Sequence, residues 1–193
     1  MTFWHCAVVL VDQTVTYLEM TSRDQLVAAR VPSTDITLTN VDRTSSGLIR
    51  ATHDRIATPH HWSSLAWTEQ MWLNLLSYSG AQTWIARSGE EVIGLVQLQP
   101  RPPNEVQITK FGLVPEWIGR GLGGHLLTLA TRLAWDFDDV SRVWLLTTSL
   151  DHPHALSNYR SRGFRPFRVE HGQREIPTRA REHAPPGGHF GPL

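Results

Sequence analysis

A cluster of four glycines constrains the fold of this chain more than any other feature of its sequence. Residues 112–127 read GLVPEWIGRGLGGHLL, and glycines occupy four of the six positions 119–124, directly before a segment with the apolar pattern of a helix. Glycine lets backbone N–H groups approach a bound group closely, and the first turn of a helix adds about half a positive charge. The cluster therefore predicts either a phosphate-binding loop that leads into a helix, or a turn that only packs a helix against a strand.

Two common phosphate loops fit this cluster poorly. Gly119, Gly121 and Gly124 have the spacing of the dinucleotide fingerprint, but residues 115–118 separate them from the preceding strand, and only one further buried strand follows. A triphosphate loop needs Lys followed by Ser or Thr after its last glycine, whereas His and Leu follow here. A cradle for some other phosphorylated ligand is the functional interpretation that remains.

The composition indicates one domain without a strong electrostatic field. A chain of 193 residues can bury a core without disulfides or metal, and its 18 Lys and Arg residues balance 18 Asp and Glu residues. We therefore expect neither a nucleic-acid nor a membrane partner, and the apolar run at 7–11 is too short to span a bilayer. The single Cys6 is typical of a reducing compartment, so we expect the cytoplasm. Lys110 is the only lysine, which we attribute to codon bias.

Hydrophobic patterning predicts an α/β domain. We expect strands at residues 15–20, 36–41, 84–87, 92–98, 105–114, 140–147 and 165–170. We expect helices at 45–56, at 121–136, at 153–162, and from a Thr68 cap to 77 with Met71, Leu75 and Leu76 facing inward. Residues 1–13 are expected to form a flexible leader, 14–170 the folded domain, and 171–193 a mobile tail rich in Pro, Gly and His.

The order of these elements and motifs resembles the GNAT superfamily of acyl-CoA N-acyltransferases over residues 35–170. The family's loop motif, Gln/Arg-x-x-Gly-x-Gly/Ala, falls on residues 118–123, where both glycines match and Ile118 takes the first position. The resemblance implies a mixed, mostly antiparallel central sheet flanked by helices, in which strands 105–114 and 140–147 splay apart to form the acyl-CoA cleft. It rests on strand 105–114, Pro115, the glycine loop with its helix, strand 140–147, Ala155, Asn158-Tyr159 and Gly163-Phe164.

The resemblance implies acetyl-CoA or another acyl-CoA as co-substrate. Backbone amides of the glycine loop would cradle the pyrophosphate, and the Arg in the loop is a further phosphate partner through its fork of donors. A backbone N–H near the end of strand 105–114, where the family's strand carries a bulge, would polarise the thioester carbonyl. A His replaces the Asn that contacts the pantetheine arm in that family. The residues in these roles are Leu113, Arg120, Gly121, Gly123, Gly124 and His152.

Two residues match catalytic positions of the family. Glu105 opens the strand before the loop, where many relatives carry a carboxylate that removes the amine proton; alternatively, it is a solvated carboxylate in a turn. Tyr159 matches the phenol that protonates the leaving thiolate; alternatively, it packs in the core. The segment between the first two helices is the expected acceptor wall. There His60, His61, Trp62 and Trp67 suit a flat or cationic amine, unless the tryptophans are simply buried.

These features predict transfer of an acetyl group to an amine of a small molecule. Two alternatives stay open: an acyltransferase that takes its acyl group from the pantetheine of an acyl carrier protein, and a non-catalytic acyl-CoA binding module. We expect a monomer or a homodimer. The ten His residues predict no metal site, because no His-Glu-x-x-His motif occurs among them.

Overall fold

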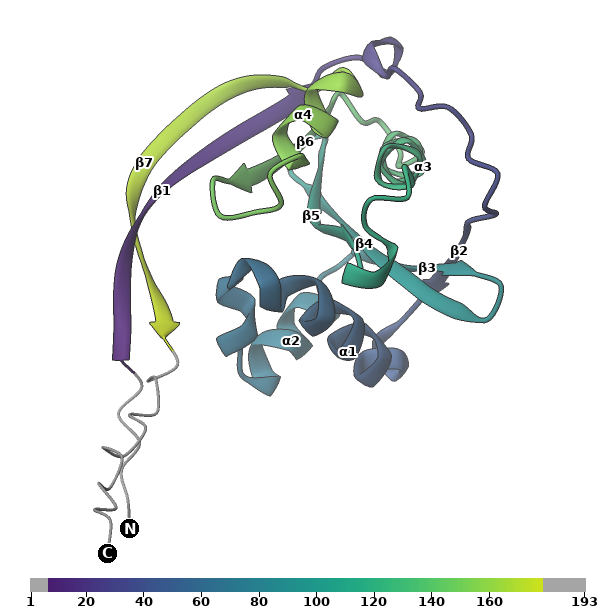
Figure 1. Ribbon diagram of the computed structural model, residues 1–193. Helices are drawn as coiled ribbons and strands as arrows, with labels where there is room; N and C mark the ends of the chain where they lie inside the picture. Colours follow the sequence, from purple (N-terminus) through teal and green to yellow (C-terminus); the bar gives the residue numbers. More distant parts are fainter. Residues whose placement is uncertain (1–6, 179–193) are drawn as a thin grey trace, which may run out of the picture.

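The computed structural model describes residues 7–178, and within this range the chain forms one seven-stranded sheet (Figure 1). The strands lie in the order β2-β3-β4-β5-β6-β1-β7, and every neighbouring pair is antiparallel except β5 and β6. This is the mixed, mostly antiparallel sheet that the sequence predicts. The strands are β1 (Ala7–Met20), β2 (Thr37–Val41), β3 (Gln82–Ser88), β4 (Glu91–Arg101), β5 (Glu105–Leu113), β6 (Arg142–Thr148) and β7 (Arg165–Thr178).

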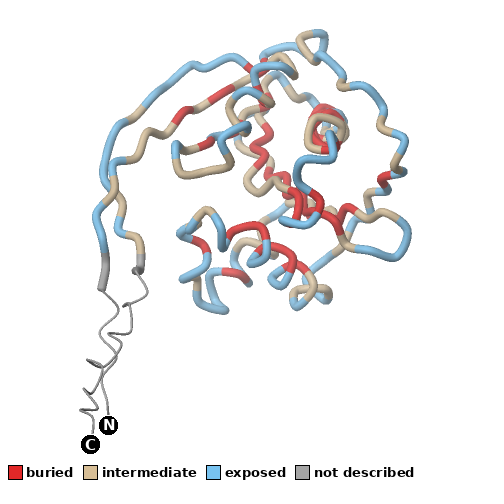
Figure 2. Tube along the Cα trace, viewed as in Figure 1, coloured by how far each residue is buried: buried red, intermediate tan, exposed pale blue. Residues whose placement is uncertain are grey.

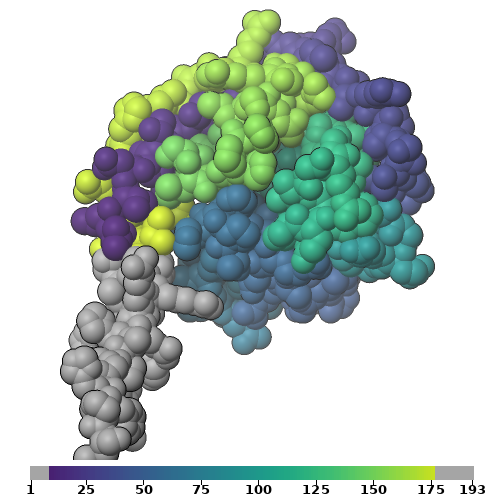
Figure 3. Space-filling view, in the orientation of Figure 1, coloured from purple at the N-terminus to yellow at the C-terminus, as the bar shows by residue number. Residues whose placement is uncertain are grey.

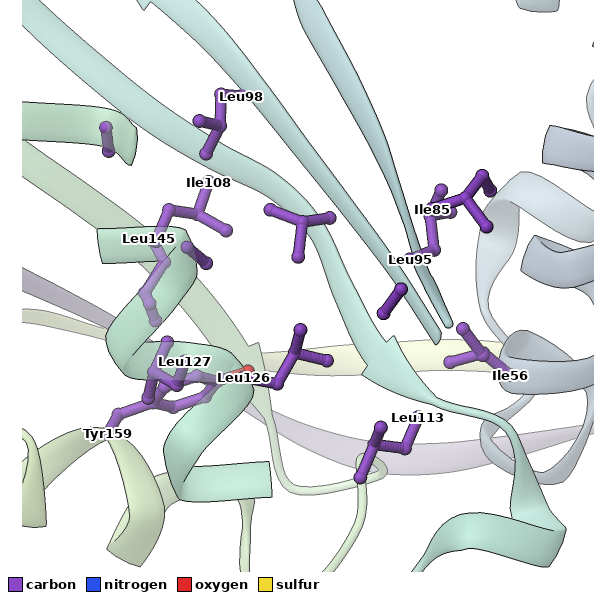
Figure 4. Packing of buried hydrophobic residues seen from close by; sticks show 14 of the residues in the cluster. Ile56, Ile85, Leu95, Leu98, Ile108, Leu113, Leu126, Leu127, Leu145 and Tyr159 are labelled. Carbon is purple, nitrogen blue, oxygen red and sulfur yellow. The ribbon is translucent and has the colours of Figure 1, made fainter. Parts of the chain in front are cut away.

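Four α-helices flank the sheet in the described part of the chain. The helix α3 packs against β5 and β6, whereas α1 packs against β4. Figure 4 shows part of the core between these layers, where Leu126 and Leu127 of α3 are fully buried and Leu145 of β6 is 2% exposed. No helix among residues 7–178 is both long and apolar enough to cross a membrane. The helices are α1 (Ser46–Ala57), α2 (Glu69–Leu76), α3 (Gly123–Trp135) and α4 (Ala155–Ser161).

The helix α2 begins as predicted, and Leu75 and Leu76 pack partly buried against the core as expected, but Trp72 takes the inward position expected of Met71. Thr68 caps it, because the Thr68 side chain accepts a hydrogen bond from the N–H of Met71 at 3.3 Å. Met71 itself is 45% exposed, which corrects the expectation that it faces inward. Trp72 is the buried residue, and its ring lies edge-on to His53 at 4.7 Å between centroids. Burial of the larger aromatic side chain therefore sets the rotation of this helix.

The strands β1 and β7 are longer than predicted and form an antiparallel ribbon that extends away from the body of the domain (Figure 1). Their pairing runs from Ala7↔Thr178 to Glu19↔Arg165, so residues 7–13 and 171–178 are strands and not parts of a leader and a tail. The prediction failed because backbone hydrogen bonds hold this ribbon while most of its side chains stay exposed or half-buried (Figure 2). The rest of the expected leader and tail, 1–6 and 179–193, lies outside the described residues.

Gly163 lets the chain pass tightly between α4 and β7. Its φ is +99°, and a Cβ there would lie 1.9 Å from the carbonyl oxygen of Gln25. We expect Gly163→Ala to lower the free energy of unfolding by at least about 2 kcal/mol in urea titration, because both the backbone and Gln25 must move. Gly47→Ala is the matched control: a Cβ meets nothing within 4 Å in α1, so stability should rise by up to about 1 kcal/mol. Equal effects of the two substitutions would contradict the assigned packing.

Candidate active site

The cleft lies where β5 and β6 part. These parallel strands pair only from Glu105↔Arg142 to Gln107↔Trp144, although β5 continues to Leu113 and β6 to Thr148. A cavity of about 430 Å³ adjoins the separated ends and is lined by the end of β5, the glycine loop and α4. In Figure 3, the light-green segment after β6 lies beside the teal of α3 and the blue of the α1–α2 connection. The splayed strands that the sequence predicts are therefore present.

The glycine loop forms one wall of this cavity. Gly119 and Gly121 have φ values of +81° and +74°, a conformation that favours glycine. The helix α3 then begins at Gly123, after an N-cap residue, Leu122, that makes no side-chain capping hydrogen bond. The N–H groups of the first turn of α3 are thus left without a side-chain cap beside the cavity, where the helix dipole adds positive potential. This geometry suits a bound phosphate.

Arg162, directly after α4, approaches the start of α3. A Cβ on Gly124 would lie 2.9 Å from Nη1 of Arg162 and 3.3 Å from Oδ1 of Asn158, and all three residues line the cavity. The Nε of Arg162 is buried and has no hydrogen-bond partner among the described residues. The sequence predicts Arg120 as the arginine that binds the phosphate, but Arg120 does not line the cavity. Its guanidinium lies 4.4 Å from the centre of the Trp117 ring, and this cation–π contact holds it elsewhere.

Tyr159 is packed in the core and also faces the cavity. Its ring is 8% exposed and packs edge-on against Phe111 and Phe164, at 6.1 and 6.4 Å between centroids. It also lines the cavity. Burial, followed by the charge of Asp151, raises the pKa of the phenol well above its usual value of 10. Tyr159 therefore keeps its proton at neutral pH and can donate it to a developing anion.

Three histidines line the same cavity: His60, His152 and His154. The ring of His152 lies 6.2 Å from that of His60 and 5.4 Å from that of His154, between centroids. Partial burial, and then the charges of His154 and His60, lower the pKa of His152, so its imidazole is neutral at pH 7. Within residues 7–178, no group of three or more His, Cys, Asp or Glu side chains is arranged to hold a metal ion.

The α1–α2 connection contributes only part of the predicted acceptor wall. Trp62 lines the cavity and donates its indole N–H to Oδ1 of Asp151 at 2.8 Å. His61 does not line the cavity, because it takes a left-handed conformation (φ +49°) after a 3-10 turn, and the preceding His60 takes that place. Trp67 lies outside the cavity wall and packs, partly buried, against the core.

Glu105 lies at the wrong end of β5 for the role predicted for it. It accepts a hydrogen bond from Nη1 of Arg142 at 2.9 Å, and the same guanidinium binds Glu19 at 2.6 Å. Leu113 lies eight positions after Glu105, which amounts to about 25 Å along a strand. Leu113 lines the cleft as predicted, whereas Glu105 lines a separate pocket beside Pro102. The predicted base Glu105 therefore lies outside the cleft, because the strands part at the opposite end of β5.

Lys110 is the residue that the sequence interpretation missed. It follows a bulge in β5, where the register jumps from Gln97↔Lys110 to Leu98↔Ile108; the bulge was expected near Leu113. The Lys110 Nζ donates to Oγ of Ser64 at 2.8 Å, and no ion pair of Lys110 is present within residues 7–178. The available signal is that the only lysine of the sequence lies within a predicted strand of the sheet.

The environment of Lys110 is aromatic and mostly dry. Its Nζ lies 4.6 Å from the centre of the Trp67 ring and 5.5 Å from that of Trp62. Burial lowers the pKa of Lys110 from 10.5 to about 8, and the charge of Asp151 opposes this shift only in part. A half-buried cation with no ion-pair partner among residues 7–178 is typical of a functional site.

The fold and the cleft have the features of the acyltransferase class that the sequence resembles. A family model described as the Acetyltransferase (GNAT) family matches residues 50–164, more than half of the chain. The chain therefore belongs to this family, whose members generally use acetyl-CoA as co-substrate. A search of curated proteins found no match.

Solved structures share this fold at low sequence identity. A functionally unknown conserved protein from Staphylococcus epidermidis is 16% identical with a TM-score of 0.61, covering 84% of this chain and 61% of its own. A GCN5-related N-acetyltransferase from Kribbella flavida is 14% identical with a TM-score of 0.59. The match covers 85% of this chain and 58% of that protein. The third structure is an aminoglycoside acetyltransferase from an uncultured soil metagenomic sample, in complex with sisomicin. It is 13% identical with a TM-score of 0.52, and the match covers 65% of this chain and 86% of that protein. This chain thus spans about three fifths of the length of the first two, and the likeness shows the fold alone.

The lowered pKa of Lys110 makes a prediction about stability. Below about pH 8 the lysine is charged in both the folded and the unfolded state, so folding carries the full cost of burying the charge. Between pH 8 and 10.5 the unfolded state binds more protons, so the stability of the parent protein rises with pH. We expect Lys110→Met to be more stable than the parent at pH 7, by up to about 3 kcal/mol, with the difference shrinking as the pH approaches 10.

Urea unfolding of both proteins from pH 7 to 10 measures this difference. Arg50→Met is the control, because it removes an exposed cation from α1 and should show no such trend. A difference between Lys110→Met and the parent that stays constant over the whole range would contradict the buried, destabilised charge.

Proposed function

We propose that this chain transfers an acyl group, most simply acetyl, from acyl-CoA to the amine of a small molecule. One observation carries the proposal: a single cavity joins the uncapped start of α3, the gap between β5 and β6, and the buried phenol of Tyr159. These three features match the three demands of the reaction, which are a phosphate cradle, a slot for an extended arm, and a proton donor.

The residues present fit an acyl-CoA. The amides of Gly121, Gly123 and Gly124 and the guanidinium of Arg162 would bind the pyrophosphate, because glycines leave the backbone accessible and Arg162 Nε has no other partner among the described residues. The edge of β5 beyond Gln107 has no β6 partner and would pair with the amides of the pantetheine arm. The bound thioester supplies the activated acyl group.

The chemistry that we propose uses the phenol of Tyr159. The amine nitrogen attacks the thioester carbonyl carbon, a backbone N–H near Leu113 stabilises the developing negative charge on oxygen, and the carbon–sulfur bond breaks. Tyr159 donates its proton to the departing sulfur. The proton that the amine loses passes to water in the cavity, because Nδ1 of the neutral His152 already accepts the backbone N–H of His154 at 3.2 Å and its Nε2 therefore carries the proton. Glu105 takes no part in this scheme, because it does not line the cavity.

A matched pair of arginine substitutions tests the phosphate cradle. We expect Arg162→Gln to weaken CoA binding about 10- to 100-fold in calorimetry, because hydrogen bonds to a charged group are lost. Arg120→Gln makes the same chemical change in the glycine loop but outside the cavity, and it should change affinity less than about threefold. A larger loss from Arg120→Gln than from Arg162→Gln would contradict the assignment. Failure of the parent chain to bind CoA would instead favour a carrier-protein donor.

Tyr159→Phe tests the proton donor. The substitution keeps the ring between Phe111 and Phe164 and removes only the hydroxyl, so CoA affinity and melting temperature should barely change. We expect kcat to fall roughly 10²- to 10⁴-fold, measured as release of free CoA thiol. A stability loss of about 1 kcal/mol or more with an unchanged kcat would assign Tyr159 to the core alone.

A further inference from the structure

A second, smaller cavity adjoins the cleft. It has a volume of about 150 Å³ and shares Trp62, Phe111, Asp151 and Tyr159 with the larger cavity. A small molecule held there would lie next to Tyr159, on the side of the cleft formed by β5 and the α1–α2 connection. On the function proposed above, this is the side from which the acceptor amine would reach the thioester.

Lys110 is held on the wall of this cavity by a directional chain of hydrogen bonds. Asp54 can only accept, so Nδ1 of His53 carries the proton in their 2.8 Å hydrogen bond. Burial lowers the pKa of His53, so its Nε2 is unprotonated and accepts the Ser64 hydroxyl proton at 2.8 Å. The Oγ of Ser64 is therefore free to accept from Lys110. This bond uses one of the three Nζ–H donors of Lys110 and leaves two for a ligand.

Arg174 brings a second cation to the same cavity from β7. Its Nη1 lies 3.5 Å from the side-chain oxygen of Gln13, and its Nη2 is buried without a hydrogen-bond partner among the described residues. Asp151 also lines the cavity, but its carboxylate already accepts from the Trp62 indole, from Thr147 Oγ1 and from the Thr148 N–H, each at 2.8 Å. The cavity thus holds two cations with unused donors against one carboxylate that is already satisfied.

We propose that this second cavity binds a carboxylate of the acceptor, so that the acceptor class is an amino acid or another small amine that carries a carboxylate. Two cations and one anion leave a net charge of one, which matches a monoanion better than a phosphate dianion. The fork of Arg174 and the two remaining donors of Lys110 suit the two oxygens of a carboxylate. The small volume suits the carboxylate end of a small acceptor, whose amine would then lie beside Tyr159 at the boundary between the two cavities.

The test compares matched acceptors with the full chain and acetyl-CoA. Each of the twenty amino acids is assayed beside its amide, which replaces the carboxylate by a neutral group of similar shape. We expect kcat/KM for at least one amino acid to exceed that of its amide about tenfold or more, because donors left unpaired in a buried site reject the analogue. Arg174→Gln should reduce that ratio toward one through KM, with kcat nearly unchanged.

Controls separate this inference from the function on which it rests. Arg165→Gln removes an exposed arginine of β7 that lines neither cavity, and it should leave the ratio unchanged. Amides that react as well as their acids, or an Arg174→Gln variant that slows both alike, would overturn the carboxylate site while leaving acyl transfer intact. A preference for phosphorylated amines over carboxylates would also overturn it. If no amine reacts, calorimetry measures the affinity of amino acids for the chain in the presence of CoA. The site is refuted if no amino acid binds more weakly to Arg174→Gln than to the parent chain.

Discussion

The parting of two parallel strands in the middle of the sheet determines where everything functional in this chain can lie. After Gln107 and Trp144, β5 keeps β4 as its only sheet neighbour and β6 keeps β1. The backbone groups on the two facing edges need other partners, because an unpaired buried N–H or C=O costs as much as a lost hydrogen bond. A ligand with amides of its own along an extended arm is a chemically matched partner for such an edge. The start of α3 and the wall formed by α4 adjoin this gap, so the phosphate cradle and Tyr159 are brought to it together.

Several groups at the cleft are arranged for binding at a cost in stability. Lys110 is half-buried without an ion pair, and buried donors of Arg162 and Arg174 have no partner, among the described residues. Uncompensated buried charges of this kind lower stability, so the core around them must supply the difference. The buried cluster of His53, Ser64 and the neighbouring tryptophans fixes the position of the Lys110 cation, so that little rearrangement is needed when a ligand arrives.

The sequence predicts those features that depend on local pattern. The glycine loop, the helix that follows it and the strands around it can be predicted because positive φ values and apolar runs have clear residue preferences. Tyr159 lines the cavity as predicted, because the resemblance to the family, and not the local pattern alone, indicated its position. The ribbon of β1 and β7 was missed because its strands are held by backbone pairing between residues 146 to 171 positions apart in sequence, with little burial to mark them.

The differences between the predicted and the observed site have one physical origin. The sequence gives the position of a residue along a strand or helix, but not the direction of its side chain. It also does not give the end of the strand at which the cleft opens. Arg120 was chosen for its place in the glycine loop, yet Trp117 holds it away and Arg162 from another element approaches instead. Glu105 was chosen for its strand, and that strand opens at its other end. Lys110 was passed over because its contacts with Ser64 and two tryptophans come from a segment some fifty residues earlier.

A crystal structure of the chain with acetyl-CoA tests the central claim most directly. The account predicts the pyrophosphate on the amides of residues 121–124 beside Arg162, with the pantetheine arm in the gap between β5 and β6 and the thioester sulfur within hydrogen-bond reach of the Tyr159 hydroxyl. Acetyl-CoA bound outside this gap, or a gap filled by the chain itself at saturating acetyl-CoA, would contradict it.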